Sequence, residues 1–251
     1  MNRNMFTPID LSVRGRVLRI AHRGASAYAP ENSLIAFEKA AEMGADSVEI
    51  DIHITADDVP VVTHDGDLKR VFGIDGAIKD LSLAQLSAVL PSDREPIPTF
   101  EQVVAICADL KLGLYLDVKR LNKVGGQTIF TVLRHYGLFA YSIFGSFQPD
   151  LVAGIKAARP DALTSILFGA VNIRPVAIAE AVGAAFVHPC WENAADEPHR
   201  LLTPEWIGAV RAAHLGIVCW HEERPSEIAA LSALSVDAIC SDTPDILTQY
   251  T

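Results

Sequence analysis

Side chains that can bind a metal ion or transfer a proton gather in one stretch of the sequence, residues 20–70. Carboxylate oxygens are the ligands that Mg²⁺ and Ca²⁺ prefer, and histidine can gain or lose a proton near neutral pH. The stretch therefore has the residue types of a metal site and of acid–base chemistry. The residues concerned are His22, Arg23, Glu31, Glu49, Asp51 and His64.

Residues 47–55 indicate how some of these groups are positioned. The run is typical of a strand, in which alternate side chains point to opposite faces. One face carries Val48, Ile50 and Ile52, and the other carries Glu49, Asp51 and His53. Three ionisable groups on one face cannot all belong to an apolar core. We expect that face to look into a wet or metal-containing site.

The elements around this strand follow from apolar runs and capping residues. Residues 17–21 form an apolar strand that ends on His22. A helix is predicted over 33–43, with Asn32 or Ser33 as its N-cap and Gly44 at its C-terminal stop.

The rest of the chain alternates strands with helices. With the first two strands there are eight strands, each followed by a helix, which implies a parallel sheet with right-handed crossovers. Eight such units most simply close as a (β/α)₈ barrel, an α/β fold whose chemistry lies at the C-terminal ends of the strands. The further strands are predicted at 112–119, 141–147, 162–168, 185–188, 216–220 and 238–240, and the further helices at 100–109, 124–136, 150–159, 175–182, 204–213, 225–234 and 244–250.

Residues 65–99 interrupt this alternation. They are rich in Gly, Pro, Asp and Ser and predict one short helix, 83–89, before Thr99 caps the next helix. We interpret them as an insertion after the second strand of a single barrel domain that spans residues 1–251. A length of 251 residues suits one α/β barrel.

Polar residues at the predicted strand ends test the barrel hypothesis. They fall at the C-terminal ends of the strands, where the fold places chemistry, and therefore predict one shared pocket. They are His22, Glu49, Asp51, His64, Asp117, Lys119, Ser146, Gln148, His188, Trp220, His221 and Asp242.

The charge and composition of the chain indicate which classes of partner and which cellular compartment to expect. The chain has 31 acidic and 21 basic residues, a formal net charge of −10, and no run rich in Lys or Arg. This argues against nucleic acid or an anionic membrane as the main partner. Residues 1–15 lack the apolar core of a secretory signal, and no apolar run of about 18 residues could span a membrane. Four cysteines without a CxxC motif fit free thiols in the cytoplasm. The oligomeric state is left open.

The sequence resembles the glycerophosphodiester phosphodiesterase family, within the phosphatidylinositol phosphodiesterase-like barrels. The similar motifs occur in the family's order and cover nearly the whole chain. The resemblance implies a (β/α)₈ barrel with an insertion after the second strand. It also implies hydrolysis of glycerophosphodiesters to glycerol 3-phosphate and an alcohol, with a divalent cation. The motifs are HRG at 22–24, PEN at 30–32, GADSVEIDIHIT at 44–55, PVVTHD at 60–65 with Leu68 and Arg70, DVK at 117–119, SFQ at 146–148 and VDAICSDTPDIL at 236–247.

Within this resemblance, three carboxylates and two cations would hold the metal and the phosphate. Glu49, Asp51 and Asp117 would bind Mg²⁺ or Ca²⁺, which neutralises the phosphate and can lower the pKa of a bound hydroxyl. Arg23 and Lys119 would hold the non-bridging phosphate oxygens.

The histidines would supply acid–base catalysis. His22 would be the general base and His64 the general acid. The nucleophile is either water or the neighbouring glycerol hydroxyl, which would form a cyclic phosphate. Trp220 would line the substrate pocket or serve in aromatic packing. Glu31 is a supporting residue that could orient His22, approach the metal or support a helix N-terminus.

Two departures from the family pattern bear on the substrate. The third carboxylate is usually Glu in an ExK pair, whereas this chain has Asp117 with Lys119. A DxK pair resembles sphingomyelinase D-type phospholipases. Strand seven has CWHEE where family members often have WT-x-N. The alternative is thus a lysophospholipase D-like or sphingomyelinase D-like enzyme acting on a longer lipid phosphodiester. A catalytically silent barrel is disfavoured because both histidines and all three carboxylates are present.

Overall fold

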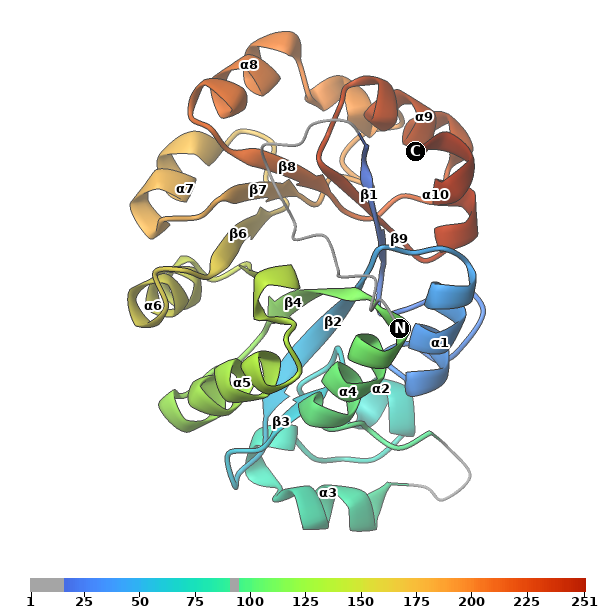
Figure 1. Ribbon diagram of the computed structural model, residues 1–251, viewed down its shortest axis with the longest axis vertical. Coiled ribbons are helices and arrows are strands. Elements are labelled where there is room, and N and C mark those ends of the chain that lie inside the picture. Colours follow the sequence, from blue (N-terminus) through green and yellow to red (C-terminus); the bar gives the residue numbers. More distant parts are fainter. Residues whose placement is uncertain (1–15, 91–94) are drawn as a thin grey trace, which may run out of the picture.

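Eight parallel strands close into a barrel in the computed structural model of the chain, which describes residues 16–90 and 95–251 (Figure 1). The first of them pairs with both the second and the last, which closes the ring. The predicted (β/α)₈ fold is confirmed, and each strand ends within one residue of its predicted bounds. The barrel strands are β1 (Leu18–Ala21), β2 (Ser47–Ile54), β4 (Gly113–Val118), β5 (Ser142–Ser146), β6 (Leu163–Phe168), β7 (Phe186–Pro189), β8 (Gly216–Cys219) and β9 (Ala238–Ser241).

Helices follow the barrel strands and form the outer layer of the molecule (Figure 1). Their apolar faces pack on the outward side chains of the strands, which buries the larger part of the hydrophobic core. These helices are α1 (Leu34–Glu42), α4 (Phe100–Leu110), α5 (Lys123–His135), α6 (Pro149–Ala158), α7 (Pro175–Val182), α8 (Pro204–Ala212), α9 (Pro225–Ala233) and α10 (Pro244–Tyr250).

Capping side chains determine where the helices next to the site begin. Ser33 caps α1 by accepting a hydrogen bond from the backbone of Ala36. Of the two N-caps predicted for α1, Ser33 is therefore the correct one, which leaves Asn32 free for another contact. Thr99 is the N-cap of α4, as predicted, and it forms a capping box with Gln102.

The segment between β2 and α4 contains more structure than the sequence predicted. The strand β3 (Pro60–Val62) pairs antiparallel with the end of β2. It is followed by α2 (Lys69–Phe72), the 3₁₀ helix η1 (Ile78–Asp80) and α3 (Leu83–Val89). The prediction of a single helix here was wrong because α2 and η1 are too short to show a helical period. A separate small core, which includes Leu68, Ile78 and Leu86, holds the segment together.

The alternation of β2 and β4 places polar groups inside the barrel. Val48, Ile50 and Ile52 pack in the core cluster under the helices, as predicted. Glu49 and Asp51 point the other way, and both are buried. In the parallel register of the two strands, Asp51 lies opposite Asp117. The fold therefore brings carboxylates from two strands to the same height.

Two sequence predictions concern membranes. Among residues 16–90 and 95–251, no helix has the length and apolar character needed to cross a bilayer. The prediction that residues 1–15 hold no secretory signal lies outside the described residues.

Candidate active site

Three buried carboxylates form the centre of the candidate site. Glu49 and Asp51 come from β2 and Asp117 from β4, and none is more than 2% exposed. One oxygen from each lies within 4.8 Å of the others. Within the described part of the chain, Glu49 Oε1 and Asp117 Oδ1 have no hydrogen-bond partner. Buried acceptors without a donor are costly, so the cluster fits a bound divalent cation.

The electrostatics of the cluster support this interpretation. Burial, together with the charges of Asp51 and Asp117, raises the pKa of Glu49 well above its usual value. Burial also raises the pKa of Asp117 to about 6, although Lys119 opposes the shift. Burial acts in the same direction on Asp51, but the charges of Lys119 and Arg23 outweigh it and lower the pKa of that carboxyl. Three carboxylates in one low-dielectric space repel one another, and a divalent cation would relieve that repulsion.

Lys119 is the first of two cations that border the cluster. Its Nζ lies 3.0 Å from Asp51 Oδ1 and 2.5 Å from Asp117 Oδ2. Burial works to lower the pKa of Lys119, but the two carboxylates raise it above its usual value, so the side chain is charged. It also lies 5.7 Å from the ring centroid of Trp220. The ammonium is therefore positioned between the carboxylates and the aromatic part of the site.

Arg23 is the second cation, and the HRG turn places it. Its backbone N–H donates to Glu49 Oε2 at 3.0 Å, and its Nε lies 3.4 Å from Asp51 Oδ2. Arg23 and Gly24 both have positive φ, 54° and 84°. A Cβ added at Gly24 would lie 2.7 Å from the Cβ of Ala36, so glycine is required there. Left-handed backbone at a non-glycine residue is typical of a functional turn.

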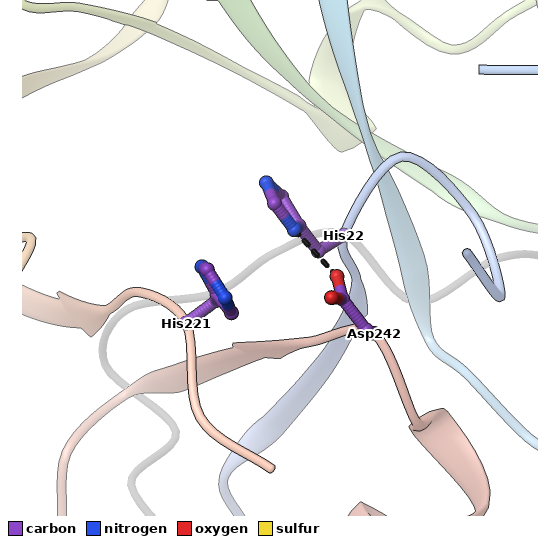
Figure 2. A group of neighbouring side chains, drawn as sticks. All are labelled: His22, His221 and Asp242. Carbon is purple, nitrogen blue, oxygen red and sulfur yellow. Dashed lines mark hydrogen bonds and ion pairs between the residues drawn. The ribbon is translucent and has the colours of Figure 1, made fainter. Parts of the chain in front are cut away.

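His22 is held from two sides at the end of β1. Its Nδ1 hydrogen-bonds Asp242 Oδ1 at 2.6 Å, and its ring stacks on that of His221 with centroids 4.6 Å apart (Figure 2). Its Nε2 lies 4.0 Å from Glu49 Oε2 and has no hydrogen-bond partner in residues 16–90 and 95–251. Burial lowers the pKa of His22 to about 4, in spite of Asp242. The ring is thus neutral at pH 7, with Nε2 directed at the carboxylate cluster.

His64 lies beyond the end of β3, and its side chain is 31% exposed. Its Nδ1 hydrogen-bonds Asp65 Oδ1 at 2.7 Å. Its carbonyl oxygen accepts from His53 Nε2 at 3.1 Å, so His53 supports this loop and is not among the residues of the carboxylate cluster. The structure therefore places the second histidine on a partly exposed loop, where Asp65 engages its ring.

Glu31 contacts two arginines, which is a different role from the three alternatives left open by the sequence. Its carboxylate pairs with Arg23 at 3.2 Å and with Arg70 at 2.5 Å. The next residue, Asn32, donates from Nδ2 to Asp51 Oδ2 at 2.9 Å. The PEN motif thus positions Arg23 and Asp51 from the side of α1.

Trp220 lies at the junction of several strand ends. Its ring centroid is 5.2 Å from that of His22, 5.6 Å from that of His188 and 5.6 Å from that of Phe147. Its Nε1 is buried without a hydrogen-bond partner in the described residues. The indole therefore lies next to His22 and Lys119, and its ring contacts agree both with aromatic packing and with a place beside the substrate.

Sequence reasoning did not predict the contacts of four residues that hold the site, although it named each of them in a motif or at a strand end: Asn32, Asp65, Arg70 and Asp242. Asp242 follows the last strand directly, and its position at a strand end was a usable signal. The contacts of the other three depend on side-chain directions that no sequence pattern specifies.

Comparison with known proteins identifies the family to which the chain belongs. Residues 22–246 match the model described as the glycerophosphoryl diester phosphodiesterase family. The chain belongs to this family. It is 30% identical to YhdW of Bacillus subtilis (strain 168) over 241 residues, which cover 91% of this chain and 95% of YhdW. It is 25% identical to the glycerophosphodiester phosphodiesterase of Caldanaerobacter subterraneus over 92% of this chain and 96% of that enzyme.

Solved structures of similar proteins show the same barrel. A phosphodiesterase of Oleispira antarctica, solved with the product sn-glycerol-3-phosphate, has a TM-score of 0.80 and 25% identity over 95% of this chain and 97% of its own. The glycerophosphodiester phosphodiesterase of Agrobacterium tumefaciens has a TM-score of 0.79 and 21% identity over 93% of this chain and 100% of its own, which supports the fold. The family resemblance and the enzyme class, a phosphoric diester hydrolase, are thereby confirmed.

Proposed function

We propose that this family member hydrolyses glycerophosphodiesters to glycerol 3-phosphate and an alcohol, with a divalent cation held by Glu49, Asp51 and Asp117. The observation that carries the proposal is the convergence of these three buried carboxylates beside the neutral ring of His22. The product sn-glycerol-3-phosphate bound to the Oleispira antarctica phosphodiesterase supports the substrate class. The cation would be Mg²⁺ or Ca²⁺, because all three ligands are hard carboxylate oxygens.

Arg23 and Lys119 are proposed to bind the phosphodiester. Both reach the edge of the carboxylate cluster, so a phosphate beside them would lie next to the cation site. The guanidinium offers paired N–H donors, and the ammonium offers a point charge. The bound cation would offset the charge of the phosphate. Trp220 would contact the glycerol portion through its ring.

His22 is proposed to act as the general base. Its Nε2 takes the proton from the attacking oxygen while a new P–O bond forms, and Asp242 holds Nδ1 so that Nε2 stays free to accept. The attacking oxygen belongs to water or to the neighbouring glycerol hydroxyl. In the second case a cyclic phosphate forms first and water opens it.

His64 is proposed to act as the general acid. The P–O bond to the alcohol breaks, and its electron pair goes to the departing oxygen, which takes a proton from His64. Because Asp65 engages Nδ1, the proton would come from Nε2. The exposed position of His64 would let the alcohol leave toward solvent.

A longer lipid phosphodiester is the second candidate substrate. A cavity of about 570 Å³ borders Glu31, and its lining includes Val62, Phe72 and Ile97. The lining is mixed, because it also includes Asn32, Thr63 and Glu95, and its apolar side chains could contact an acyl chain. The Asp117–Lys119 pair resembles that of sphingomyelinase D-type phospholipases. The first candidate remains preferred because of the family match.

One assay separates these functions. Purified protein is incubated with glycerophosphocholine or with lysophosphatidylcholine, with Mg²⁺, with Ca²⁺ or with chelator. Cation-dependent release of glycerol 3-phosphate from glycerophosphocholine is the expected result. Preferential release of choline from lysophosphatidylcholine would favour the lipid substrate. No turnover of either would favour a silent barrel. The variant Glu49→Gln should release glycerol 3-phosphate more slowly than the wild type, and Glu38→Gln, on the exposed face of α1, should match the wild type.

The cysteines support a reducing compartment such as the cytoplasm. All four are free, and Cys107, Cys219 and Cys240 are buried. Burial raises the pKa of Cys107 and of Cys219, so these thiols are protonated and unreactive at neutral pH.

A further inference from the structure

Arg70 connects the segment outside the barrel to the candidate active site. It lies on α2 and its guanidinium bridges two carboxylates. Nη2 and Nη1 lie 2.5 Å and 3.3 Å from the two oxygens of Glu31, and Nε donates to Asp65 Oδ2. Three donors of one planar group are thus used by two acidic side chains, a geometry that lysine cannot reproduce.

Each of these two carboxylates also contacts a residue of the proposed mechanism. Asp65 uses Oδ1 for His64 Nδ1 at 2.7 Å and Oδ2 for Arg70. Glu31 uses Oε2 for Arg23 Nη1 at 3.2 Å. A continuous series of ionic contacts therefore runs from the proposed acid to the proposed phosphate ligand. Arg70 is its central member.

Arg70 should affect the orientation of the catalytic side chains more than the free energy of unfolding. Its side chain is 51% exposed, and exposed ion pairs contribute little to the free energy of unfolding. The rate of catalysis is more sensitive to orientation, because a shift of about 1 Å at a reacting group can lower the rate about 100-fold. His64 follows a strand end on a loop and is partly exposed, so the direction of its ring depends on Asp65.

We propose that Arg70 is a positioning residue: it holds His64 through Asp65, and Arg23 through Glu31, in the orientation that catalysis requires. This inference rests on the proposed function, since it assigns Arg70 to the same reaction. It also gives the segment between β3 and α4 a role, because Arg70 on α2 would orient both the proton donor His64 and the phosphate ligand Arg23.

The kinetic test compares two leaving groups. The variants Arg70→Lys and Arg70→Gln are assayed on glycerophosphocholine and on a glycerophosphodiester with a p-nitrophenyl leaving group. We expect kcat on glycerophosphocholine to fall about 10- to 100-fold. The loss of kcat on the aryl ester should be much smaller, because its leaving group needs no proton. The weaker hold on Arg23 should instead raise KM on both substrates alike, because both carry the same phosphate. Asp65→Asn should show the same difference in kcat between the two substrates. The double variant of Arg70 and Asp65 should lose no more kcat than either single variant.

A neighbour on the same helix provides the matched control. Lys69 pairs with Asp75 at 2.8 Å, and both side chains are exposed. Lys69→Gln should keep wild-type kcat and KM on both substrates. Equal losses of kcat on both substrates for the Arg70 variants, or additive losses of kcat with Asp65→Asn, would overturn the inference.

A measurement without turnover keeps the inference separate from the proposed function. If the wild type hydrolyses neither substrate, the proposed function fails. The ¹⁵N chemical shifts of the His64 ring then still report its tautomer. We expect one fixed tautomer, with the proton on Nδ1, which donates to Asp65, in the wild type and in Lys69→Gln. Arg70→Gln should show averaging between tautomers. Identical His64 shifts in the wild type and Arg70→Gln would refute the positioning role.

Discussion

Asp51 on β2 and Asp117 on β4 lie opposite each other in the parallel register of the barrel, and the ammonium of Lys119 bridges them. Both carboxylates are buried, so their repulsion is not screened by water. Lys119 and Arg23 supply two positive charges for a cluster of three carboxylates that also contains Glu49. This shortage of positive charge is the physical reason to expect a divalent cation.

The length of the third carboxylate can be tested directly. In Asp117→Glu, an added methylene would move the carboxyl group toward Lys119 and Asp51, which are already in contact. Overpacking at a buried position costs about 1–3 kcal/mol. We expect weaker cation binding by titration calorimetry and about a tenfold lower kcat. Tighter cation binding with higher kcat would show that the site merely tolerates aspartate.

The two histidines should differ in their dependence on the leaving group. His64→Ala should lose on the order of 10²–10⁴-fold in kcat/KM on an alkyl glycerophosphodiester and much less on a p-nitrophenyl ester. His22→Ala, which lacks the proposed base, should lose similarly on both. If the leaving-group dependence occurs in His22→Ala instead, the two roles are exchanged. If it occurs in neither, another group protonates the alcohol.

Acidification should destabilise the barrel through His188. This side chain is 1% exposed, hydrogen-bonds the hydroxyl of Tyr115 at 2.7 Å, and has its pKa lowered to about 3 by burial. A histidine in the unfolded chain titrates near 6.5, so between pH 6.5 and 3 the unfolded state binds the extra proton. The free energy of unfolding therefore falls as the pH falls through this window.

The measurement is denaturant unfolding of the wild type and His188→Gln at pH 7 and pH 5. From pH 7 to pH 5 the wild type should lose about 2 kcal/mol more than the variant, as linkage requires for this shift. The same pH dependence in both proteins would show that His188 is protonated in the folded state.

Much of the fold was predictable because its determinants are local. The alternation of apolar runs with capped helices gave each barrel strand within one residue. The period of two along β2 placed Glu49 and Asp51 on the inner face, opposite Ile50. These features depend on backbone geometry, which the residue pattern reports directly.

The contacts that hold the site were not predictable in the same way. His22 and Asp242 are 220 positions apart, and only the closing pair of strands, β1 and β9, brings them together. The choice between Asn32 and Ser33 as the N-cap of α1 was open, and the contact of Asn32 with Asp51 explains the outcome. The four residues of α2 are too few to show a period, so the position of Arg70 was hidden as well.

Cation dependence of catalysis is the central claim, and one titration tests it most directly. The wild type and Glu49→Gln are stripped with excess chelator, and glycerol 3-phosphate release from glycerophosphocholine is followed while Mg²⁺ or Ca²⁺ is added back. The wild type should be inactive until cation is added and then recover saturably. Glu49→Gln should need far more cation and stay slower at saturation, because it lacks one charged ligand. Full turnover by Glu49→Gln in excess chelator would contradict the account.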